Sequence, residues 1–396
     1  MTHGRQADPA KFLAGLKCGG VELVTGVPCS SMTGLMNAVL ADRTLDFANA
    51  PNEGEALAFA AGARLGGKTA AVLCQNSGLS NLSNALTSLT VPYRIPVLLI
   101  VGWRGQPGGH DEPQHRLIGR LSRPFLKACG VSVHVASADN AEALAESCAR
   151  GVADNGRSQA ILVPMKLFSD VDATLDSSLP RRPVCEISRD EPGSRPTRDT
   201  VLEALLDIIP DDALIVAPTG LASRALFQLG DAASRFYMMG SMGHAPALGL
   251  GIAATTKRRV IVLDGDGSIL MRLSGLAFVG GRAPENLVHI VLDNGIHEST
   301  GGQASLSPHT DLCAIASACG YSASAEAHSI KALTRTAAAM LETPGPGFIR
   351  ILTRAERAAA PPRIPLTADA IAKRFSGAIA ASREMVIDKE ARGAAE

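Results

Sequence analysis

The sequence lacks a surplus of charge of either sign. Lysine and arginine together number 38, and aspartate and glutamate also number 38, so the formal net charge of the 396 residues is zero at pH 7. Binding to a nucleic-acid backbone or to an anionic membrane surface relies on a cationic surplus. The balanced charge therefore argues against nucleic acids and membranes as partners.

Aromatic residues are scarce, and long apolar runs are missing. Aromatics make up 4% of the chain and hydrophobic residues overall 46%. Cores must then be built from Ala, Leu, Val and Ile, a composition that suits helices packed on buried parallel strands. No run approaches the ~20 apolar residues that span a bilayer, and the first residues lack the apolar stretch of a secretory signal. We expect a soluble, cytoplasmic protein.

Closely spaced cysteine pairs are absent as well. The eight cysteines are scattered and include no CxxC motif, so we expect reduced thiols. Cys29, which follows an expected strand and precedes Ser30 and Ser31, is either a nucleophile or a buried thiol. The buried thiol is favoured because the sequence assigns it no basic partner.

What the sequence does contain is a regular alternation of short β-branched runs and longer stretches rich in Ala and Leu. Between residues 1 and 170, helical stretches near 54–66, 78–90 and 141–154 connect the strand candidates. This pattern is typical of a mostly parallel sheet covered by helices on both faces. The strand candidates are 21–27, 45–50, 69–76, 96–103, 131–136 and 159–165.

The alternation stops at residues 171–196, where Ser, Pro, Asp and Arg dominate, and this stretch is predicted to be a linker. It resumes over residues 197–382, ending in a helix near 367–382, and the tail 383–396 is predicted to fray. The chain is thus expected to fold as two doubly wound parallel-sheet α/β domains without a third domain between them. The alternating segments of the second domain are 201–209, 213–220, 222–229, 235–240, 245–256, 258–267, 286–294, 311–320, 329–341 and 347–353.

Two polar residues follow successive expected strands in the second domain. Asp266 lies just past one strand and Asn294 ends the next, 28 positions later, which is about the length of one strand–helix–strand unit. If the strands are neighbours, both side chains emerge at the carboxyl edge of the sheet, where α/β proteins bind ligands. A carboxylate, an amide oxygen and a main-chain carbonyl form a partial oxygen shell that suits Mg²⁺, which commonly adds ligand phosphates and water.

The residues around Asp266 also favour a phosphorylated ligand. Gly265 and Gly267 allow close approach of the backbone, and Ser268 stands at an expected helix start whose N–H groups and dipole favour a phosphate. GDGS alone favours an ordinary strand-to-helix turn, so the assignment depends on its pairing with Asn294.

GDGS, followed after a helix by a strand ending in DN, resembles the fingerprint of thiamin diphosphate-dependent enzymes, among them the 2-oxo acid decarboxylases. The resemblance implies that Asp266, Asn294 and the carbonyl group of Ile296 hold Mg²⁺ on the diphosphate of the cofactor. The family pattern usually closes with two asparagines, whereas Asp293 precedes Asn294 here. The metal-binding position itself is kept.

The same resemblance assigns a carboxylate of the first domain to the cofactor. In NEGEALAFAAGARLGGK, Glu53 stands nine residues before Gly62. This spacing is similar to that of the glutamate that hydrogen-bonds the aminopyrimidine ring and so activates thiamin diphosphate. Glu55 is the alternative residue, and a solvated acidic helix start is the alternative role for both.

The segment GSMGHAPALGLGIA at 240–253 resembles the part of these enzymes that supports the cofactor between the two domains. Met242 would be the apolar support and Ser241 a neighbouring cofactor contact, with core filler as the alternative role of the methionine. GLGIAA also imitates the glycine pattern of nicotinamide-linked oxidoreductases. We reject that match because the glycines do not directly follow a strand.

Three segments narrow the resemblance to short decarboxylases that act on phosphonopyruvate, with those acting on sulfopyruvate as the nearest relatives. The implied reaction is the loss of carbon dioxide from 3-phosphonopyruvate to give phosphonoacetaldehyde. Sulfopyruvate is the alternative substrate, and a homologue that binds the cofactor without catalysis is the alternative of another class. The segments are QNSGLSNLSNALTSL at 75–89, GWRGQPGGHDEPQH at 102–115 and DNGIHESTGGQ at 293–303.

Polar residues near these segments are candidates for proton transfer and substrate binding. His115 and His297 are the candidate proton carriers, with a hydrogen-bonded loop residue as the alternative for each. Arg104 is the candidate partner of an anionic substrate group. The DEPQH turn, which begins at Asp111, is either a lid or a helix cap. Candidates for hydrogen bonds to the substrate are Ser30, Ser31 and Asn76.

The resemblance also implies an assembly. In this family the pyrimidine-binding domain of one subunit, here 1–170, commonly meets the diphosphate-binding domain of another, here 197–382. We therefore expect a homodimer or larger symmetric oligomer in which Glu53 and Asp266 of one active site come from different chains.

Overall fold

The computed structural model of the chain describes residues 5–172, 183–355 and 360–393, with side chains through residue 381. Within these ranges no helix combines the length and the apolar composition needed to cross a membrane.

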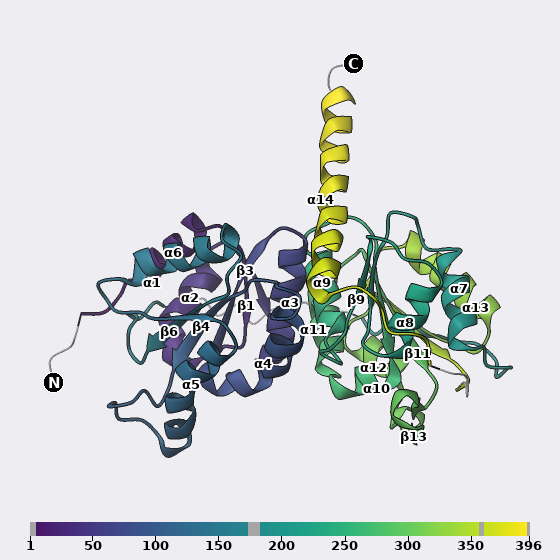
Figure 1. Cartoon of the computed structure of the whole chain (residues 1–396), viewed down its shortest axis with the longest axis horizontal. Coiled ribbons are helices and arrows are strands. Elements are labelled where there is room, and N and C mark those ends of the chain that lie inside the picture. Colours follow the sequence, from purple (N-terminus) through teal and green to yellow (C-terminus); the bar gives the residue numbers. More distant parts are fainter. Residues whose placement is uncertain (1–4, 173–182, 356–359, 394–396) are drawn as a thin grey trace. The chain divides into compact units, whose positions relative to one another are not determined.

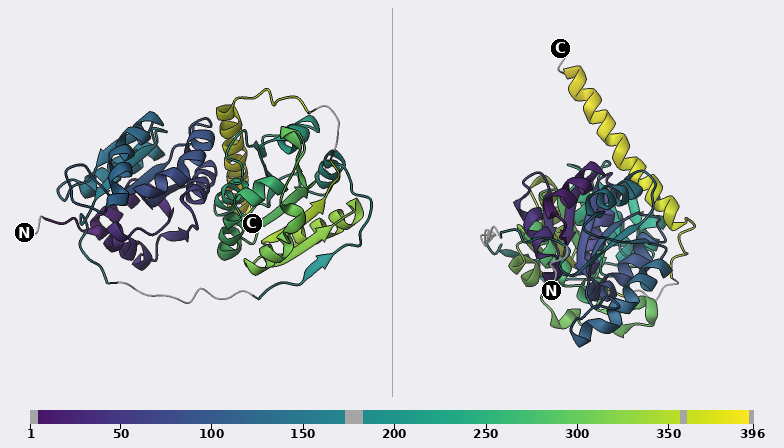
Figure 2. Two further views of the ribbon diagram at one scale, coloured as in Figure 1. Left: turned by 90° about the horizontal axis from the view of Figure 1, so that it is seen from below. Right: turned by 90° about the vertical axis from the view of Figure 1, so that its left-hand side faces the viewer.

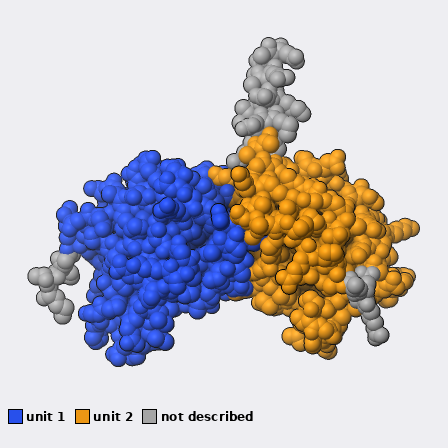
Figure 3. Space-filling view, viewed as in Figure 1, with its two compact units in different colours: residues 1–64, 68–180 blue, residues 65–67, 181–396 orange. Residues whose placement is uncertain are grey.

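The chain divides into two compact units (Figure 3). Unit 1 contains residues 1–64 and 68–180, and unit 2 contains residues 65–67 and 181–396. Part of the predicted linker, residues 173–182, lies outside the described residues. The boundaries predicted from composition stay predictions.

Unit 1 is built around a six-stranded sheet. Its strands are β1 (Val21–Gly26), β2 (Asp46–Asn49), β3 (Thr69–Gln75), β4 (Leu98–Trp103), β5 (Ser132–Val135) and β6 (Gln159–Pro164). They run in the order β2-β1-β3-β4-β6-β5, and all neighbours are parallel. Residues 98–101 of β4 are completely buried, and each such aliphatic side chain contributes roughly 1.5–3 kcal/mol through its burial. All six strands lie where the sequence predicts them.

Helices cover this sheet on both faces (Figure 1). They are α1 (Pro9–Cys18), α2 (Thr33–Ala41), α3 (Glu53–Leu65), α4 (Leu79–Ala85), α5 (Arg116–Ala128) and α6 (Ala141–Ala153), with short helical turns η1 (Ser30–Met32), η2 (Asn76–Gly78), η3 (Leu86–Thr90) and η4 (Pro113–His115). α1, α2 and α6 pack over one apolar core, to which Phe12, Leu35 and Val152 belong. The β1–α2–β2 and β2–α3–β3 crossovers run in opposite directions, so the winding of the sheet reverses between β1 and β3.

Unit 2 contains a seven-stranded sheet and a small hairpin. The sheet strands are β7 (Ile187–Arg189), β8 (Leu214–Ala217), β9 (Arg235–Tyr237), β10 (Val260–Gly265), β11 (Leu287–Asp293), β14 (Ala323–Ala327) and β15 (Gly347–Leu352), and the hairpin strands are β12 (Ile296–His297) and β13 (Gln303–Ala304). The sheet is parallel throughout, in the order β7-β14-β15-β11-β10-β8-β9. Its winding reverses between β8 and β10. The predicted fold class, two doubly wound parallel-sheet units, is confirmed.

Helices also cover both faces of the second sheet (Figures 1 and 2). α7, α8 and α13 pack along one face, and α9, α11 and α12 along the other. α14 continues past residue 382, where the sequence predicts its end. The helices are α7 (Arg198–Leu206), α8 (Leu221–Gln228), α9 (Ala245–Ala253), α10 (Asp266–Met271), α11 (Ser274–Arg282), α12 (Leu312–Ala318), α13 (Ile330–Glu342) and α14 (Ala368–Gly393), with short turns η5 (Glu298–Thr300) and η6 (Ser307–His309).

Candidate active site

A pocket opens at the carboxyl edge of the unit 2 sheet, beside the point where its winding reverses. β10 and β11 are parallel neighbours, with Gly265 paired to Leu292, so Asp266 and Asn294 follow adjacent strand ends. The predicted neighbourhood of the two strands is confirmed. The predicted site residues that line this one pocket are Met242, Gly265, Asp266, Gly267, Ser268, Asn294, Ile296 and His297.

Asp266 is the buried carboxylate of the pocket. Only 5% of its surface is exposed. Ser305 and Ser307 donate hydrogen bonds from their hydroxyl groups to Oδ2, the latter over 3.3 Å. Burial raises the pKa of Asp266, and the nearby Asp293 carboxylate adds to this effect. A positive ion beside Asp266 would relieve the cost of burying its charge.

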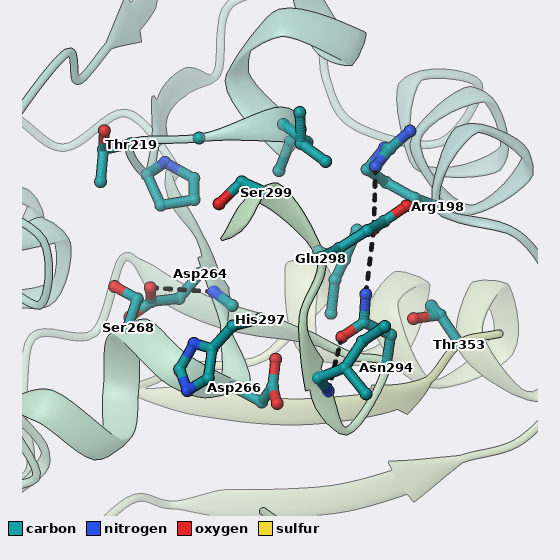
Figure 4. Close-up of a pocket in the computed structure, with 18 of the residues that line it drawn as sticks. Arg198, Thr219, Asp264, Asp266, Ser268, Asn294, His297, Glu298, Ser299 and Thr353 are labelled. Carbon is teal, nitrogen blue, oxygen red and sulfur yellow. Dashed lines mark hydrogen bonds and ion pairs between the residues drawn. The ribbon is translucent and has the colours of Figure 1, made fainter. Parts of the chain in front are cut away.

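Asn294 lies on the opposite side of the pocket from Thr219 and Ser268 (Figure 4). Its Oδ1 accepts a hydrogen bond from the backbone N–H of Ile296 over 3.1 Å, and its Nδ2 donates to Glu298 over 3.0 Å. An amide oxygen has two lone pairs, so Oδ1 can still bind a cation. The oxygen-donor set of Asp266, Asn294 and the Ile296 carbonyl thus fits Mg²⁺.

The loop before α9 carries the apolar side of the pocket. Ser241 has a φ of +56° and Gly243 a φ of +89°, and these left-handed residues flank Met242, which lines the pocket. Ser268 accepts a hydrogen bond from the backbone N–H of Gly243 over 3.0 Å and so ties this loop to α10. A non-glycine residue in the left-handed region is strained, a state that is frequent at ligand sites.

Glycines leave room for a ligand along the pocket wall. A Cβ atom built on Gly265 or on Gly220 would meet nothing within 4 Å, and Gly220 has a φ of +110° immediately before α8. At Gly267, in contrast, a Cβ would lie 2.7 Å from Cε1 of His297, so the imidazole covers that glycine. Open space beside Asp266 is what a bulky phosphate group on a bound cation requires.

In unit 1, the predicted activating glutamate is the first residue of α3. Glu53 is 8% exposed, and its Oε2 accepts a hydrogen bond from Nδ2 of Asn81 over 2.8 Å. A Cβ atom on Gly78 would lie 2.2 Å from Oε1 of Glu53, so a larger residue at this position would displace the carboxyl group. Glu55 is completely buried. A solvated acidic helix start is therefore the wrong description of both residues.

The residues after β1 form a short polar turn. Cys29 is 3% exposed, which matches the buried thiol that the sequence favours. Its Sγ lies 3.1 Å from Oγ of Ser31. Ser30 is exposed. Both serines thus stand at the carboxyl edge of the sheet, as expected from their position after a strand.

Two candidate substrate contacts are already engaged within unit 1. Asn76 is completely buried; its Nδ2 donates to the carbonyl of Arg104 over 2.7 Å and its Oδ1 accepts from the same residue's N–H. The Arg104 guanidinium forms a bidentate pair with Asp111, at 2.8 and 2.6 Å. That pair holds the pKa of Asp111 far below its usual range.

In this structure, these hydrogen bonds give Asn76 and Arg104 structural roles. Asn76 anchors the backbone after β4, and Arg104 closes the 104–111 loop. The last three residues of the DEPQH turn form η4. Asp111 accepts hydrogen bonds from the N–H groups of Gly105 and Glu112, which is a loop-closing role. His115 ends η4 and is 9% exposed.

Several residues of the pocket are not predicted from the sequence. Thr219 and Gly220 line the pocket after β8, and Arg198 donates from Nη1 to Oε2 of Glu298 over 3.3 Å. The APTG end of segment 213–220, a strand followed by glycine and a helix, was the available signal for the first two. The sequence around Arg198 contains no signal for a site. Apart from Ser241 and Met242, every predicted site residue is more than 60 positions away from it.

The glycine pattern that imitates a nicotinamide site lies inside α9. Residues 245–253 form this helix and are all buried. A dinucleotide-binding loop instead connects a strand to a helix N-terminus. The rejection of the oxidoreductase interpretation therefore holds on structural grounds too.

Comparisons with known proteins bear on both units. Residues 10–120 match the family described as "Thiamine pyrophosphate enzyme, N-terminal TPP binding domain". Residues 223–351 match "Thiamine pyrophosphate enzyme, C-terminal TPP binding domain". The first match contains Glu53, and the second contains the residues of the unit 2 pocket from Met242 to His297.

Full-length relatives are similar over nearly the whole chain. A phosphonopyruvate decarboxylase of Streptomyces viridochromogenes is 43% identical over 372 residues, covering 92% of this chain and 93% of the relative. A sulfopyruvate decarboxylase of Methanosarcina acetivorans is 30% identical over 378 residues, covering 92% of this chain and 96% of that relative. Sulfopyruvate decarboxylase subunits beta and alpha of Methanothermobacter thermautotrophicus each match at 41% identity, over 31% and 29% of this chain and 66% and 68% of the subunits.

A solved structure shares the fold. The Rhodococcus jostii thiamine diphosphate-dependent 4-hydroxybenzoylformate decarboxylase superposes with a TM-score of 0.71, covering 89% of this chain and 100% of that chain, at 14% identity. At this identity the likeness concerns the fold alone.

Proposed function

The chain belongs to the thiamine pyrophosphate enzymes, together with phosphonopyruvate and sulfopyruvate decarboxylases, and we propose that it decarboxylates 3-phosphonopyruvate to phosphonoacetaldehyde. The observation that carries the proposal is the 43% identity to a phosphonopyruvate decarboxylase over 92% of the chain. The pocket chemistry supports it, because a buried carboxylate, an amide oxygen and open glycines lie together at one sheet edge.

The unit 2 pocket is proposed to hold the diphosphate end of thiamin diphosphate. Asp266, Asn294 and the carbonyl of Ile296 would bind Mg²⁺, and the metal would bind the diphosphate. Gly265 would leave room for the phosphates, and Gly267 and Ser268 at the start of α10 would donate hydrogen bonds to them. Met242, with Ser241 beside it, would support the ring system of the cofactor.

Glu53 is proposed to activate the cofactor. Its burial and its single bond from Asn81 leave Oε1 beside Gly78, where the backbone has no side chain. A carboxyl group in such a poorly solvated place suits a hydrogen bond to the aminopyrimidine nitrogen. Glu55, which is also buried, remains the competing carboxylate.

The reaction breaks one carbon–carbon bond and consumes one proton. When bound, thiamin diphosphate supplies the nucleophilic carbon and stores the electron pair of the broken bond. The carboxylate of the substrate leaves as carbon dioxide, and a proton is added to the former ketone carbon. His115 and His297 are the proposed carriers of that proton, and His297 already stands over Gly267 in the pocket.

The phosphonate group of the substrate is proposed to be recognised at the carboxyl edge of the unit 1 sheet. Ser30 and Ser31 have hydroxyl groups there, whereas a direct bond from Arg104 requires it to exchange Asp111 for the substrate. Asn76 would act through the loop that it anchors.

The active enzyme is proposed to be a homodimer or a larger symmetric assembly, located in the cytoplasm. The matches to separate alpha and beta subunits of a sulfopyruvate decarboxylase support the idea that such active sites draw on more than one chain. Glu53 of one subunit and Asp266 of another would then serve one site.

The deciding experiment measures carbon dioxide release by the purified full chain from phosphonopyruvate, sulfopyruvate and pyruvate. Each is assayed with and without thiamin diphosphate and Mg²⁺. We expect release from phosphonopyruvate that depends on both cofactors. A preference for sulfopyruvate would favour the alternative suggested by the Methanosarcina acetivorans relative, and cofactor binding without release from any acid would reject catalysis.

A further inference from the structure

Behind the pocket, four neighbouring strands of unit 2 carry charged side chains of alternating sign. The register places Arg350 of β15 opposite Glu326 of β14, and Glu326 opposite Arg189 of β7. Asp293, the last residue of β11, lies two positions beyond Val291, the register partner of Arg350, and so stands on the pocket side of the row. We call these four residues the charge ladder. Its members are Asp293, Arg350, Glu326 and Arg189.

Close contacts connect the charge ladder. Arg350 donates from Nε to Oδ2 of Asp293 over 2.7 Å, its Nη2 lies 2.6 Å from the same oxygen, and Nη1 donates to Glu326 over 3.0 Å. Arg189 lies 3.4 Å from Glu326. Asp293 is 2% exposed and Arg350 is 9% exposed. The inner end of the ladder is thus buried, and Arg350 bonds both of its acidic neighbours.

One serine joins this ladder to the pocket carboxylate. The Oγ of Ser307 lies 2.7 Å from Oδ1 of Asp293 and 3.3 Å from Oδ2 of Asp266. The backbone carbonyl of Ser307 accepts a hydrogen bond from Nη2 of Arg350 over 3.1 Å. Arg350 therefore fixes both the acid and the serine that stand directly behind Asp266.

We propose that Arg350 is a positioning residue that holds Asp266 for the divalent cation by neutralising Asp293 and fixing Ser307; this inference rests on the cofactor site proposed above. Two buried carboxylates that share one serine repel each other unless a cation compensates one of them. Arg350 supplies that compensation on the side away from the pocket. Asp266 is left to face the metal.

The test is a titration of the purified full chain, without substrate, in which calorimetry measures the affinity for Mg²⁺ at saturating thiamin diphosphate. Arg350→Met should weaken Mg²⁺ binding by about 10–100-fold, the usual effect of losing a residue that supports a metal ligand. Arg350→Lys should have an affinity between those of wild type and Arg350→Met, because lysine keeps the charge without the guanidinium donors that bond Asp293, Glu326 and Ser307 together. The double variant D293N/R350M removes both charges and should recover most of the lost affinity.

The matched control is Arg374, which pairs with Asp231 in the same unit, with Nη2 2.7 Å from Oδ1. Arg374→Met should leave Mg²⁺ affinity unchanged even if it lowers the melting temperature. A merely structural role of Arg350 would lower the melting temperature in the same way without the selective loss of metal affinity and without rescue by the second substitution.

Several outcomes separate the possibilities. If wild type binds the cofactor with Mg²⁺ and Arg350→Met binds equally well, the inference is wrong and the proposed function stands. The inference also fails if D293N/R350M binds no better than Arg350→Met. If Arg350→Met does not fold, the double variant decides: folding with near wild-type affinity supports the inference, and weak affinity overturns it. A wild type that binds no cofactor overturns the proposed function and this inference together.

Discussion

Two buried carboxylates, one in each unit, are held in different ways. Glu53 accepts a bond from an amide and lies against a glycine. Asp266 accepts bonds from two serine hydroxyls, and its burial raises its pKa. A raised pKa in a buried acid means that the negative charge is costly unless a cation is present. Asp266 is therefore suited to bind a metal, and Glu53 to share a proton.

This difference predicts that substitutions of the two carboxylates cause different defects, one in cofactor binding and one in turnover. Asp266→Ala should abolish Mg²⁺-dependent binding of thiamin diphosphate, because the only acidic member of the proposed ligand set is removed. Glu53→Gln should leave binding measurable and slow turnover by roughly 10²–10⁴-fold, the usual worth of an acid–base group. Calorimetric titration and a carbon dioxide assay measure the two effects.

Glu55→Gln is the matched control, since it changes the rival acid of the same helix turn. It should keep both cofactor binding and turnover. Normal turnover by Glu53→Gln, together with an inactive Glu55→Gln, would transfer the activating role to Glu55.

At the scale of elements, the loop between β9 and α9 combines backbone strain with a buried histidine. His244 is completely buried at the start of α9, and its Nδ1 lies 3.2 Å from the carbonyl oxygen of Ser241. Burial, with a smaller contribution from Arg272, lowers the pKa of His244 from 6.5 to about 4. The native loop therefore contains the neutral imidazole, whereas the unfolded chain takes up a proton at about pH 6.5.

The consequence is a loss of stability in acid. The contribution of neutral His244 is fully present above about pH 6.5 and is lost as the pH falls towards about 4, on the order of 3 kcal/mol in total. His244→Gln should make the free energy of unfolding less dependent on pH in this window. Urea denaturation at a series of pH values measures the difference, and equal pH slopes for wild type and variant would contradict it.

Most of the strands were predictable, and the exceptions have physical reasons. β4 is a continuous apolar run, and β11 is apolar apart from His289 and the terminal Asp293, so their hydrophobic patterns identify both strands. β14 was missed because ASAEA contains no β-branched residue. β7 was missed because its three residues lie in a polar stretch and are ordered by pairing with β14, a contact distant in sequence.

Some contacts of the candidate site were predictable from the sequence and others were not. The 28 positions between Asp266 and Asn294 predicted that they follow adjacent strands, because this separation in sequence is about the length of one strand–helix–strand unit. The pairing of Arg104 with Asp111 depends on how a glycine-rich loop closes, and the bonds from Ser305 and Ser307 depend on a hairpin that returns to the pocket. Local sequence patterns predict neither how that loop closes nor where the hairpin returns.

At the scale of the whole molecule, the proposed assembly makes a quantitative prediction. If each active site takes Glu53 from one chain and Asp266 from its partner, a mixed dimer of Glu53→Gln and Asp266→Ala chains has one intact site and one with both defects. Two inactive proteins, unfolded and refolded together in equal amounts, should regain about a quarter of wild-type activity, because about half of the dimers are mixed. A carbon dioxide assay measures the recovery, with each variant refolded alone as the control. No recovery would place both residues in the same chain's site.

In both units, the residues that stabilise the fold and the residues proposed to bind the substrate occupy different places in the sheet. The central strands β4 and β11 are buried along their whole length, whereas the pocket residues named above stand at the carboxyl ends of strands or on the segments that follow them. Enzyme engineers can therefore diversify Ser30, Ser31, Ser299 and Thr300, none of which is buried, in a library without altering either apolar interior. Selection on other 2-oxo acids would then explore new specificities on an unchanged scaffold.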